Sequence, residues 1–317
     1  MKLAISACLD GHNVTYSASN NNDDFVRKSL SKYFEFVHFC PELPIFGTPR
    51  ETIRLVDFDG ELRVISNKTV KDFTSELTSE SIKIVQQIQN DPFIYGVVLK
   101  SKSPSCGLER VKVYAQNGMS MPSNGVGILA KELKKHFPLL PIEENNRLLD
   151  AWLRENFMMQ LFAYADFEKF KSNTPNMGKL VEFHTGYKYL IMSKSTVAYK
   201  NLGNIVANRS KKEFKDVLDE YETEFKKTLH LKSSIKKTVN VLEHCYGYVK
   251  DFITKDEKES FFESLDNFRN KIVPLIAPIM LLEMFAKKHD CTYILKQKFL
   301  APYPKALALR SDLEALK

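Results

Sequence analysis

The first 140 residues alternate between short apolar runs and segments of helical spacing, and this alternation constrains the fold more than any other feature. Apolar runs of strand length occur at Lys2–Ala7, Glu35–Phe39 and Phe93–Lys100. Segments with apolar residues on one helical face occur at Phe25–Tyr33, Ile82–Gln89 and Ile128–His136. A hairpin around Asp59-Gly60 is predicted for Thr52–Phe58 and Glu61–Ile65. Strands that alternate with helices predict an α/β domain with a mostly parallel sheet and right-handed crossovers.

The strand-like runs stop at about Leu149, and the remaining chain has a helical texture. Helices are predicted at Trp152–Phe170, from Glu182 onward, at Phe214–His230, at Ile235–Tyr248 and in a late segment ending at Lys288. A chain of 317 residues, 44% of them hydrophobic, can form two cores. We therefore expect an α/β domain over residues 1–144 and an all-α domain over residues 145–317.

Three of the five cysteines, Cys8, Cys40 and Cys106, directly follow predicted strands. Because the carboxyl ends of parallel strands share one edge, these thiols can meet at one point although they are remote in sequence. Three thiolates without a nearby fourth match an iron–sulfur cluster with one open iron, or a catalytic zinc with one open position. Scattered buried thiols are the alternative.

The odd number of cysteines and the absence of paired spacings argue against a disulfide framework and for a reducing compartment. Cys245 and Cys291 have no matching partners and are expected to be free thiols. The apolar start, Met1–Cys8, is too short for a signal core and is interpreted as a strand. No run approaches the roughly 20 apolar residues of a membrane span. These features predict a soluble, cytoplasmic protein.

The loop Ser103-Pro104-Ser105-Cys106-Gly107 is expected to hold Cys106 at a rigid turn. Pro104 fixes its own φ, and Gly107 allows a tight fold just after the thiol. Lys100 and Lys102 would lower the cost of a thiolate in this loop. Further on, Gly125-Val126-Gly127 opens a helix, and its amides are expected to be free to bind an anion.

The net charge of +7 is concentrated in the second half, where eleven cations and six acids lie between Lys194 and Lys237. Such a run is usually the solvated face of helices, and the alternative is a surface for a polyanion. His184 and Lys188 lie four residues apart on one helical face and could contact phosphate. A buried, hydrogen-bonded His184 is the competing interpretation.

The N-terminal half also resembles the thiouracil desulfidase family. The resemblance rests on Ser6–Gly11, Cys40-Pro41-Glu42 with Pro49-Arg50 downstream, Ser103–Gly107 and Gly125–Gly127, and covers roughly residues 1–144. It implies a [4Fe-4S] cluster with Cys8, Cys40 and Cys106 as ligands, whose fourth iron accepts sulfur from a thiolated pyrimidine. It further implies Glu42 as the acid–base group and Ser103 as a polar group at the site that acts in catalysis. Thr15-Tyr16-Ser17-Ala18 departs from the Arg-Tyr-Asp-Gly run of the family, a change that concerns the substrate pocket and not the ligands.

The second half resembles the helical, YbgA-like accessory domain that is found fused to the desulfidase domain. The segments that carry this resemblance are Phe183–Lys188, Leu202-Gly203-Asn204 and Phe299–Pro304, with Gly186 standing where a basic residue is expected. The two-domain arrangement is similar to that of bacterial tRNA 4-thiouridine desulfidases. It implies removal of sulfur from 4-thiouridine in tRNA. From the basic stretch and the helical face of Lys188, we expect RNA contacts from Lys188, Arg209, Lys211 and Lys212.

Three alternatives remain open at this point. The enzyme could act on free thiouracil or thiouridine. The chain could instead be a non-catalytic RNA-binding protein whose thiols hold a structural metal. It could also be a zinc hydrolase.

Overall fold

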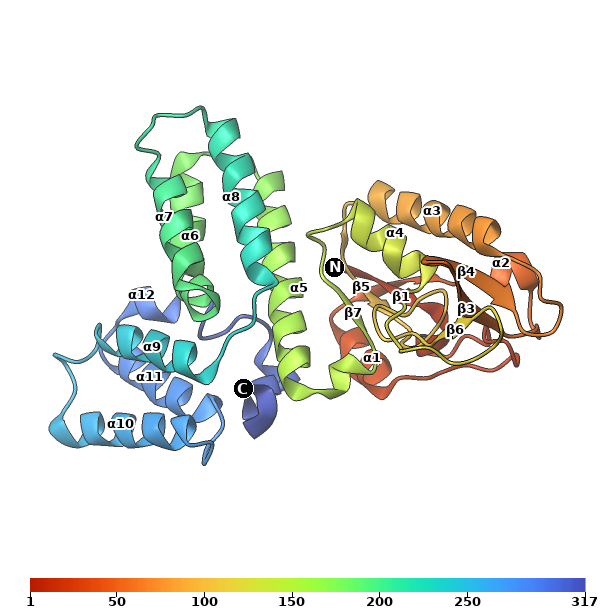
Figure 1. The fold of residues 1–317 in the computed structure, drawn as a ribbon. Helices are drawn as coiled ribbons and strands as arrows, with labels where there is room; N and C mark the ends of the chain where they lie inside the picture. The colour runs from red at the N-terminus through yellow and green to blue at the C-terminus, as the bar shows by residue number, and fades with distance from the viewer. Residues whose placement is uncertain (317) are drawn as a thin grey trace. The chain divides into compact units, whose positions relative to one another are not determined.

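A computed structural model describes residues 1–316. The chain divides into two compact units, and the division falls between Leu149 and Asp150 (Figure 1). The first unit contains strands and helices, and the second contains helices only. The predicted fold class, an α/β domain followed by an all-α domain, is confirmed. None of the helices within the described residues combines the length and apolar character needed to cross a bilayer.

The centre of the first unit is a four-stranded, fully parallel sheet of order β2-β1-β5-β7. Its strands are β1 (Lys2–Ser6), β2 (Glu35–Phe39), β5 (Ile94–Leu99) and β7 (Ile142–Glu144). β1 and β5 are the middle strands and are almost entirely buried. Buried middle strands explain why their sequences are continuously apolar rather than alternating.

The predicted hairpin forms β3 (Ile53–Phe58) and β4 (Glu61–Ser66), which pair in antiparallel fashion. β6 (Val113–Ala115) adds to β3 in parallel and completes a second sheet of order β4-β3-β6. The sequence analysis did not predict β6 or β7, because a three-residue strand is too short to show a periodic pattern.

Four α-helices and three 3₁₀ helices complete this unit. The α-helices are α1 (Asp24–Lys28), α2 (Leu43–Phe46), α3 (Thr74–Asn90) and α4 (Ile128–His136). The 3₁₀ helices are η1 (Ala7–Asp10), η2 (Leu30–Lys32) and η3 (Arg147–Leu149). α3 begins earlier than expected because the Asp72 carboxylate accepts hydrogen bonds from the amide and hydroxyl of Thr74.

The second unit contains eight α-helices within the described residues. They are α5 (Ala151–Ser172), α6 (Met177–Lys194), α7 (Thr196–Ala207), α8 (Phe214–Leu229), α9 (Ile235–Tyr246), α10 (Lys255–Arg269), α11 (Ile276–Lys288) and α12 (Thr292–Leu295). Short 3₁₀ helices follow at Lys305–Leu307, Leu309–Ser311 and Leu313–Ala315. α5, α6, α7 and α8 run alongside one another (Figure 1).

The core of the second unit is rich in aromatic rings. Phe167 of α5 contacts Phe183 of α6 and Phe225 of α8, at centroid distances of 5.4 Å in both cases. Tyr221 of α8 stacks on Phe225 and is fully buried. The aromatic stripe of Trp152–Phe170 therefore serves mainly to pack the helices together.

Candidate functional site

The three cysteines that follow strands line one cavity of about 330 Å³ in the first unit. Cys8 lies in η1 directly after β1, Cys40 follows β2, and Cys106 lies in the loop after β5. The strands end level with one another because β1 pairs with both neighbours in parallel, with Ser6 opposite Phe39 and Ile5 opposite Val98. The carboxyl edge of the sheet thus gathers residues that are 32 and 66 positions apart.

Burial makes all three thiols weak acids. It raises the pKa of Cys8 to about 11, and the charge of Cys40 adds to the effect. It raises the pKa of Cys106 well above its usual value, with further contributions from Cys40, Glu42 and Cys8. The pKa of Cys40 is also raised, by burial and then by Glu42. Thiolates at this edge therefore require a compensating positive charge, which a bound metal centre supplies.

Several polar groups point at these sulfurs. The Ser6 hydroxyl accepts a hydrogen bond from the Lys100 amide at 3.0 Å, and its interaction with Cys106 lowers the pKa of that thiol. Asn21 has the same effect on the pKa of Cys8. The sequence analysis assigned no role to Ser6 or Asn21, since neither position stands out without the fold.

Lys100 and Lys102 both line the cavity. Lys100 lowers the pKa of Cys8 by its charge, and its ammonium group donates to the Ser101 carbonyl at 3.0 Å. A stabilising effect of the two lysines on a thiolate at Cys106 stays a prediction.

Glu42 faces the cavity and forms an ion pair with Arg50. Arg50 donates to Glu42 Oε2 through Nη2 at 2.8 Å and through Nε at 3.2 Å. The remaining Arg50 contacts go to the carbonyls of Gly47 and Val14, both at 2.9 Å. Both side chains are largely buried, at 5% exposure for Arg50 and 16% for Glu42. Although Glu42 precedes α2, its carboxylate does not cap that helix.

Ser103 connects Glu42 to the loop that carries Cys106. Its hydroxyl accepts the amides of Ser105 at 3.2 Å and Cys106 at 3.1 Å. The same hydroxyl donates to Glu42 Oε1 at 3.4 Å. Cys106 and Glu42 are thus positioned through one shared hydroxyl.

The glycine-rich opening of α4 has a different role from the one expected. The amides of Gly127, Ile128 and Leu129 donate to the carbonyls of Gly107, Pro104 and Ser105, at 2.8, 3.2 and 2.9 Å. The prediction that these amides are free for an anion is therefore wrong. A Cβ on Gly127 would lie 2.5 Å from the Ser105 carbonyl oxygen, so the glycine permits this close packing. The start of α4 holds the Cys106 loop in place.

The residues predicted to contact RNA fall on separate segments of the second unit. Lys188 of α6 is half-buried, with its ammonium group 4.9 Å from the ring centres of Tyr189 and Tyr293. Arg209, Lys211 and Lys212 are exposed in the loop between α7 and α8, at one end of the α5–α8 group (Figure 1). Lys212 forms an ion pair with Glu220.

Not all the cations of the basic stretch face solvent. Lys194 is fully buried and donates to the Leu231 carbonyl at 2.8 Å. Lys226 is also buried, between Glu168 and Glu222. His184 is buried as well, with Nδ1 3.2 Å from the Tyr221 hydroxyl, and burial lowers its pKa to about 4. His184 is therefore a packed core residue and is not available to phosphate.

Comparisons with known proteins divide the chain in the same way. Residues 3–145 match the family described as 2-thiouracil desulfurase. Residues 188–304 match a family described as protein of unknown function (DUF1722). The uncharacterized protein YbgA of Escherichia coli K12 is 23% identical over 157 residues, which are 49% of this chain and 93% of that protein.

Among solved structures, a [4Fe-4S]-dependent thiouracil desulfidase, TudS, is 25% identical. It matches 47% of this chain and 93% of its own, with a TM-score of 0.38. The chain thus joins a region matched to the 2-thiouracil desulfurase family with a region matched to the DUF1722 family, which confirms the two-part resemblance seen in the sequence.

Proposed function

We propose that this chain is a [4Fe-4S]-dependent desulfidase that converts the C=S group of 4-thiouridine in tRNA to C=O. The observation that carries the proposal is the single cavity lined by Cys8, Cys40, Cys106 and Glu42. The match of residues 3–145 to the 2-thiouracil desulfurase family supports desulfidase activity. All five cysteines are free, which agrees with our proposal of a reducing, cytoplasmic location.

The donor set fits an iron–sulfur cluster with one open iron. Three thiols line the cavity, and among the described residues the lining includes no fourth cysteine or histidine. Three thiolate ligands hold a cluster that keeps one iron open. When bound, such a cluster would supply an open iron to which the departing sulfur can bind.

Glu42 is suited to activate water. Both hydrogen bonds from Arg50 to Glu42 go to Oε2. Oε1 has only the long contact to Ser103, so it is the oxygen that can accept a proton. Water adds to the ring carbon as Glu42 Oε1 accepts one of its protons. The C–S bond then breaks as Glu42 returns that proton to the leaving sulfur, and the hydroxyl on the carbon becomes C=O by releasing the second proton, which completes hydrogen sulfide. The overall change consumes one water and releases one hydrogen sulfide, and no electron donor is required.

The rim of the cavity offers a place for the pyrimidine ring. Tyr16 lines the cavity and is 54% exposed. Its segment is held against the loop that carries Arg50, because the Arg50 amide donates to the Tyr16 carbonyl at 2.8 Å. An exposed aromatic ring beside the acid–base group can stack on a flipped-out base.

The proposal of a tRNA substrate rests on the helical unit. Arg209 and Lys211 are exposed cations in one short loop, as expected for a phosphate contact. A second candidate substrate is free 2-thiouracil, which is favoured by the description of the matched family itself.

The test is to purify the full chain without oxygen, measure iron and acid-labile sulfide, and compare turnover on thiolated tRNA, 4-thiouridine and 2-thiouracil. We expect about four irons and four sulfides per chain, and turnover that is much faster on tRNA than on the free compounds. Equal turnover rates on tRNA and on the free compounds would contradict the tRNA assignment. Zinc instead of iron in the purified protein would contradict the proposed chemistry.

A further inference from the structure

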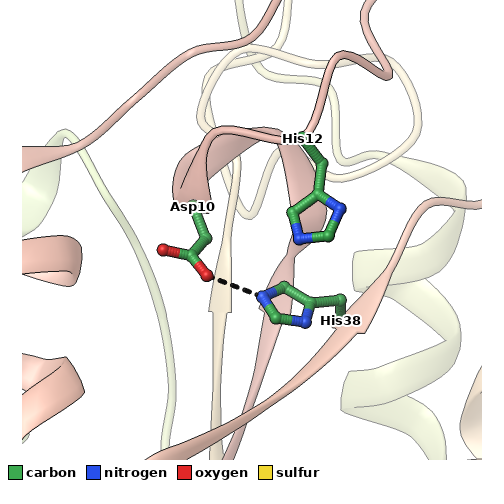
Figure 2. Close-up of side chains that lie close together, drawn as sticks. All are labelled: Asp10, His12 and His38. Atoms are coloured by element: carbon green, nitrogen blue, oxygen red, sulfur yellow. Dashed lines mark hydrogen bonds and ion pairs between the residues drawn. The ribbon is translucent and has the colours of Figure 1, made fainter.

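A second cluster of ligand side chains lies outside the cavity, on the segments that carry two of its cysteines (Figure 2). Asp10 ends η1, His12 follows Gly11, and His38 lies on β2. One ligand atom from each lies within 4.8 Å of the other two. None of the three lines the cavity with Cys8, Cys40 and Cys106.

Local geometry brings these side chains together. Gly11 adopts φ of +93°, which turns the chain after η1 and places Asp10 and His12 on the same side. His38 lies opposite Ile5 in the parallel pairing of β1 and β2, close to the start of η1. Its Nε2 atom lies 2.8 Å from Asp10 Oδ2, and its ring centre lies 4.4 Å from that of His12.

From this geometry we propose that Asp10, His12 and His38 bind a divalent transition-metal ion of the zinc class. Two imidazole nitrogens and one carboxylate oxygen suit zinc and its neighbours, whereas calcium and magnesium prefer sets made only of oxygen. A tetrahedral ion with bonds of about 2.0 to 2.1 Å would bring the ligand atoms to about 3.3 Å apart. His12 is exposed, so its ring can make the small movement required.

The surroundings leave the necessary atoms accessible. The Arg27 guanidinium lies 3.8 Å from Asp10 Oδ1, so it leaves the Oδ2 atom beside His38 for the metal. Asp10, His12 and His38 supply three ligands, and the fourth position remains for water or another small ligand. The ion would link η1 to β2, which are the segments that carry Cys8 and lead to Cys40.

The experiment titrates the cluster-loaded full chain with Zn²⁺ in the absence of oxygen, in competition with a chromophoric chelator. We expect one bound zinc per chain. Loss of the hydrogen-bond partner of a metal ligand already lowers metal affinity by about 10- to 100-fold, so loss of a ligand itself, in His12→Ala or His38→Ala, should lower zinc affinity by about 100-fold. His136→Ala changes a partly exposed histidine on α4 and should bind zinc as the native chain does. Unchanged binding in His12→Ala would overturn the site, and this variant alters an exposed residue, so folding is not at risk.

Cobalt separates this site from the cysteines. Co²⁺ bound by nitrogen and oxygen gives weak visible bands, whereas thiolate ligands add an intense sulfur-to-metal transition. We expect the weak spectrum in the native chain and its loss in His12→Ala. Weak bands that persist unchanged in that variant would refute the proposal, whereas an intense transition of equal size in both proteins would be assigned to the cysteine thiols and would cancel in the comparison. Because the readout is the difference between the native chain and the histidine variants, it holds even if the cavity itself contains no iron–sulfur cluster.

Discussion

Arg50 reaches Glu42 across a turn at Gly47, whose φ is +65°, and also donates to the Gly47 carbonyl. The ion pair lies almost entirely away from water, so each partner depends on the other for compensation of its charge. The pairing fixes which carboxylate oxygen faces the open cavity. The side chain of Glu42 therefore has one orientation available for proton transfer.

Replacement of Glu42 by Gln tests this role. The amide is nearly the same shape and keeps a carbonyl oxygen for Arg50, but it cannot accept a proton from water. Turnover should fall by about 10² to 10⁴-fold, the usual contribution of general acid–base catalysis. Iron and sulfide content should remain at the native level. Glu61→Gln, on the exposed hairpin, serves as the control and should retain full turnover.

Replacement of Cys106 by Ser tests the ligand assignment. A buried hydroxyl is a poor ligand for iron, so the purified variant should contain little iron and have no turnover. Cys291→Ser changes a half-buried thiol of the helical unit and should keep the native iron content. Equal iron in both variants would show that Cys106 does not hold the cluster. The measurement is elemental analysis together with visible absorbance.

At the residue scale, the sequence predicts the meeting of the cysteines better than it predicts the groups around them. That Cys8, Cys40 and Cys106 line one cavity could be predicted because strand ends are visible as the last apolar position, and a parallel sheet aligns them. Ser6 and Arg50 could not be assigned a role in the same way. The Ser6 hydroxyl contacts the Lys100 amide and the Cys106 thiol, which are about a hundred residues away in sequence. Arg50 reaches Glu42 across a turn that hydrophobic periodicity does not reveal.

At the element scale, the contact between α4 and the Cys106 loop determines how precisely the Cys106 thiol is held. A Cβ on Gly127 would lie 2.5 Å from the Ser105 carbonyl oxygen and 2.8 Å from the Gly107 amide nitrogen. These are backbone atoms, so the loop itself would have to move. The Gly127→Ala variant should lose about 1 to 3 kcal/mol of stability and should bind less iron.

The matched control for this variant is Gly203→Ala within α7. A Cβ at Gly203 meets no atom within 4 Å, and the helix interior favours alanine over glycine by about 0.5 to 1 kcal/mol. Chemical denaturation of both variants, followed by iron analysis, provides the comparison. A Gly127→Ala variant as stable and as iron-rich as the native chain would contradict the proposed packing role.

The contact between α6 and α8 should make the helical unit sensitive to acid. Burial lowers the pKa of His184 from 6.5 to about 4, so the unfolded chain binds this proton more readily than the folded chain. The contribution of His184 to the free energy of unfolding is therefore fully present above pH 6.5. It is lost as the pH falls toward 4, which lowers the free energy of unfolding by up to about 2 to 3 kcal/mol. His184→Gln should flatten the stability profile between pH 6.5 and 4, as measured by urea unfolding at each pH. An unchanged slope would contradict this assignment.

Element prediction succeeded where apolar patterns were long and failed where they were short. The parallel strands β1, β2 and β5 and the helix α4 lie close to their expected bounds. The strands β6 and β7 are each three residues long, and their pairing depends on partners that are distant in sequence. The helices α7 and α10 were missed although their sequences carry helical spacing, and α10 also begins with a capping box of Thr254 and Glu257.

At the scale of the whole molecule, the helical unit is expected to contribute RNA affinity without taking part in the chemistry. The Arg209→Ala/Lys211→Ala variant should bind tRNA more weakly, and the slope of log affinity against log salt should become shallower by about 1 to 2, as two phosphate contacts are lost. Turnover on free 4-thiouridine should stay the same. Filter binding over a salt series provides the measurement.

The control for this variant is Lys250→Ala/Lys258→Ala, which removes the same charge from exposed positions near and within α10. Equal losses in the two double variants would mean that overall charge, rather than the α7–α8 loop, attracts the RNA. Unchanged tRNA affinity in Arg209→Ala/Lys211→Ala would remove that loop from the interface.

Each unit has a hydrophobic core of its own. A cluster in the first unit packs the β4-β3-β6 sheet against α3 and α4, and the cluster in the second unit lies around the aromatic helices. Under the proposed function, air that destroyed a bound cluster would thus leave the helical half folded and able to bind tRNA. Oxidised molecules would then act as competitors that occupy tRNA without repairing it. The supply of iron and sulfide to the cell would in that case control tRNA desulfuration more sharply than the loss of active molecules alone.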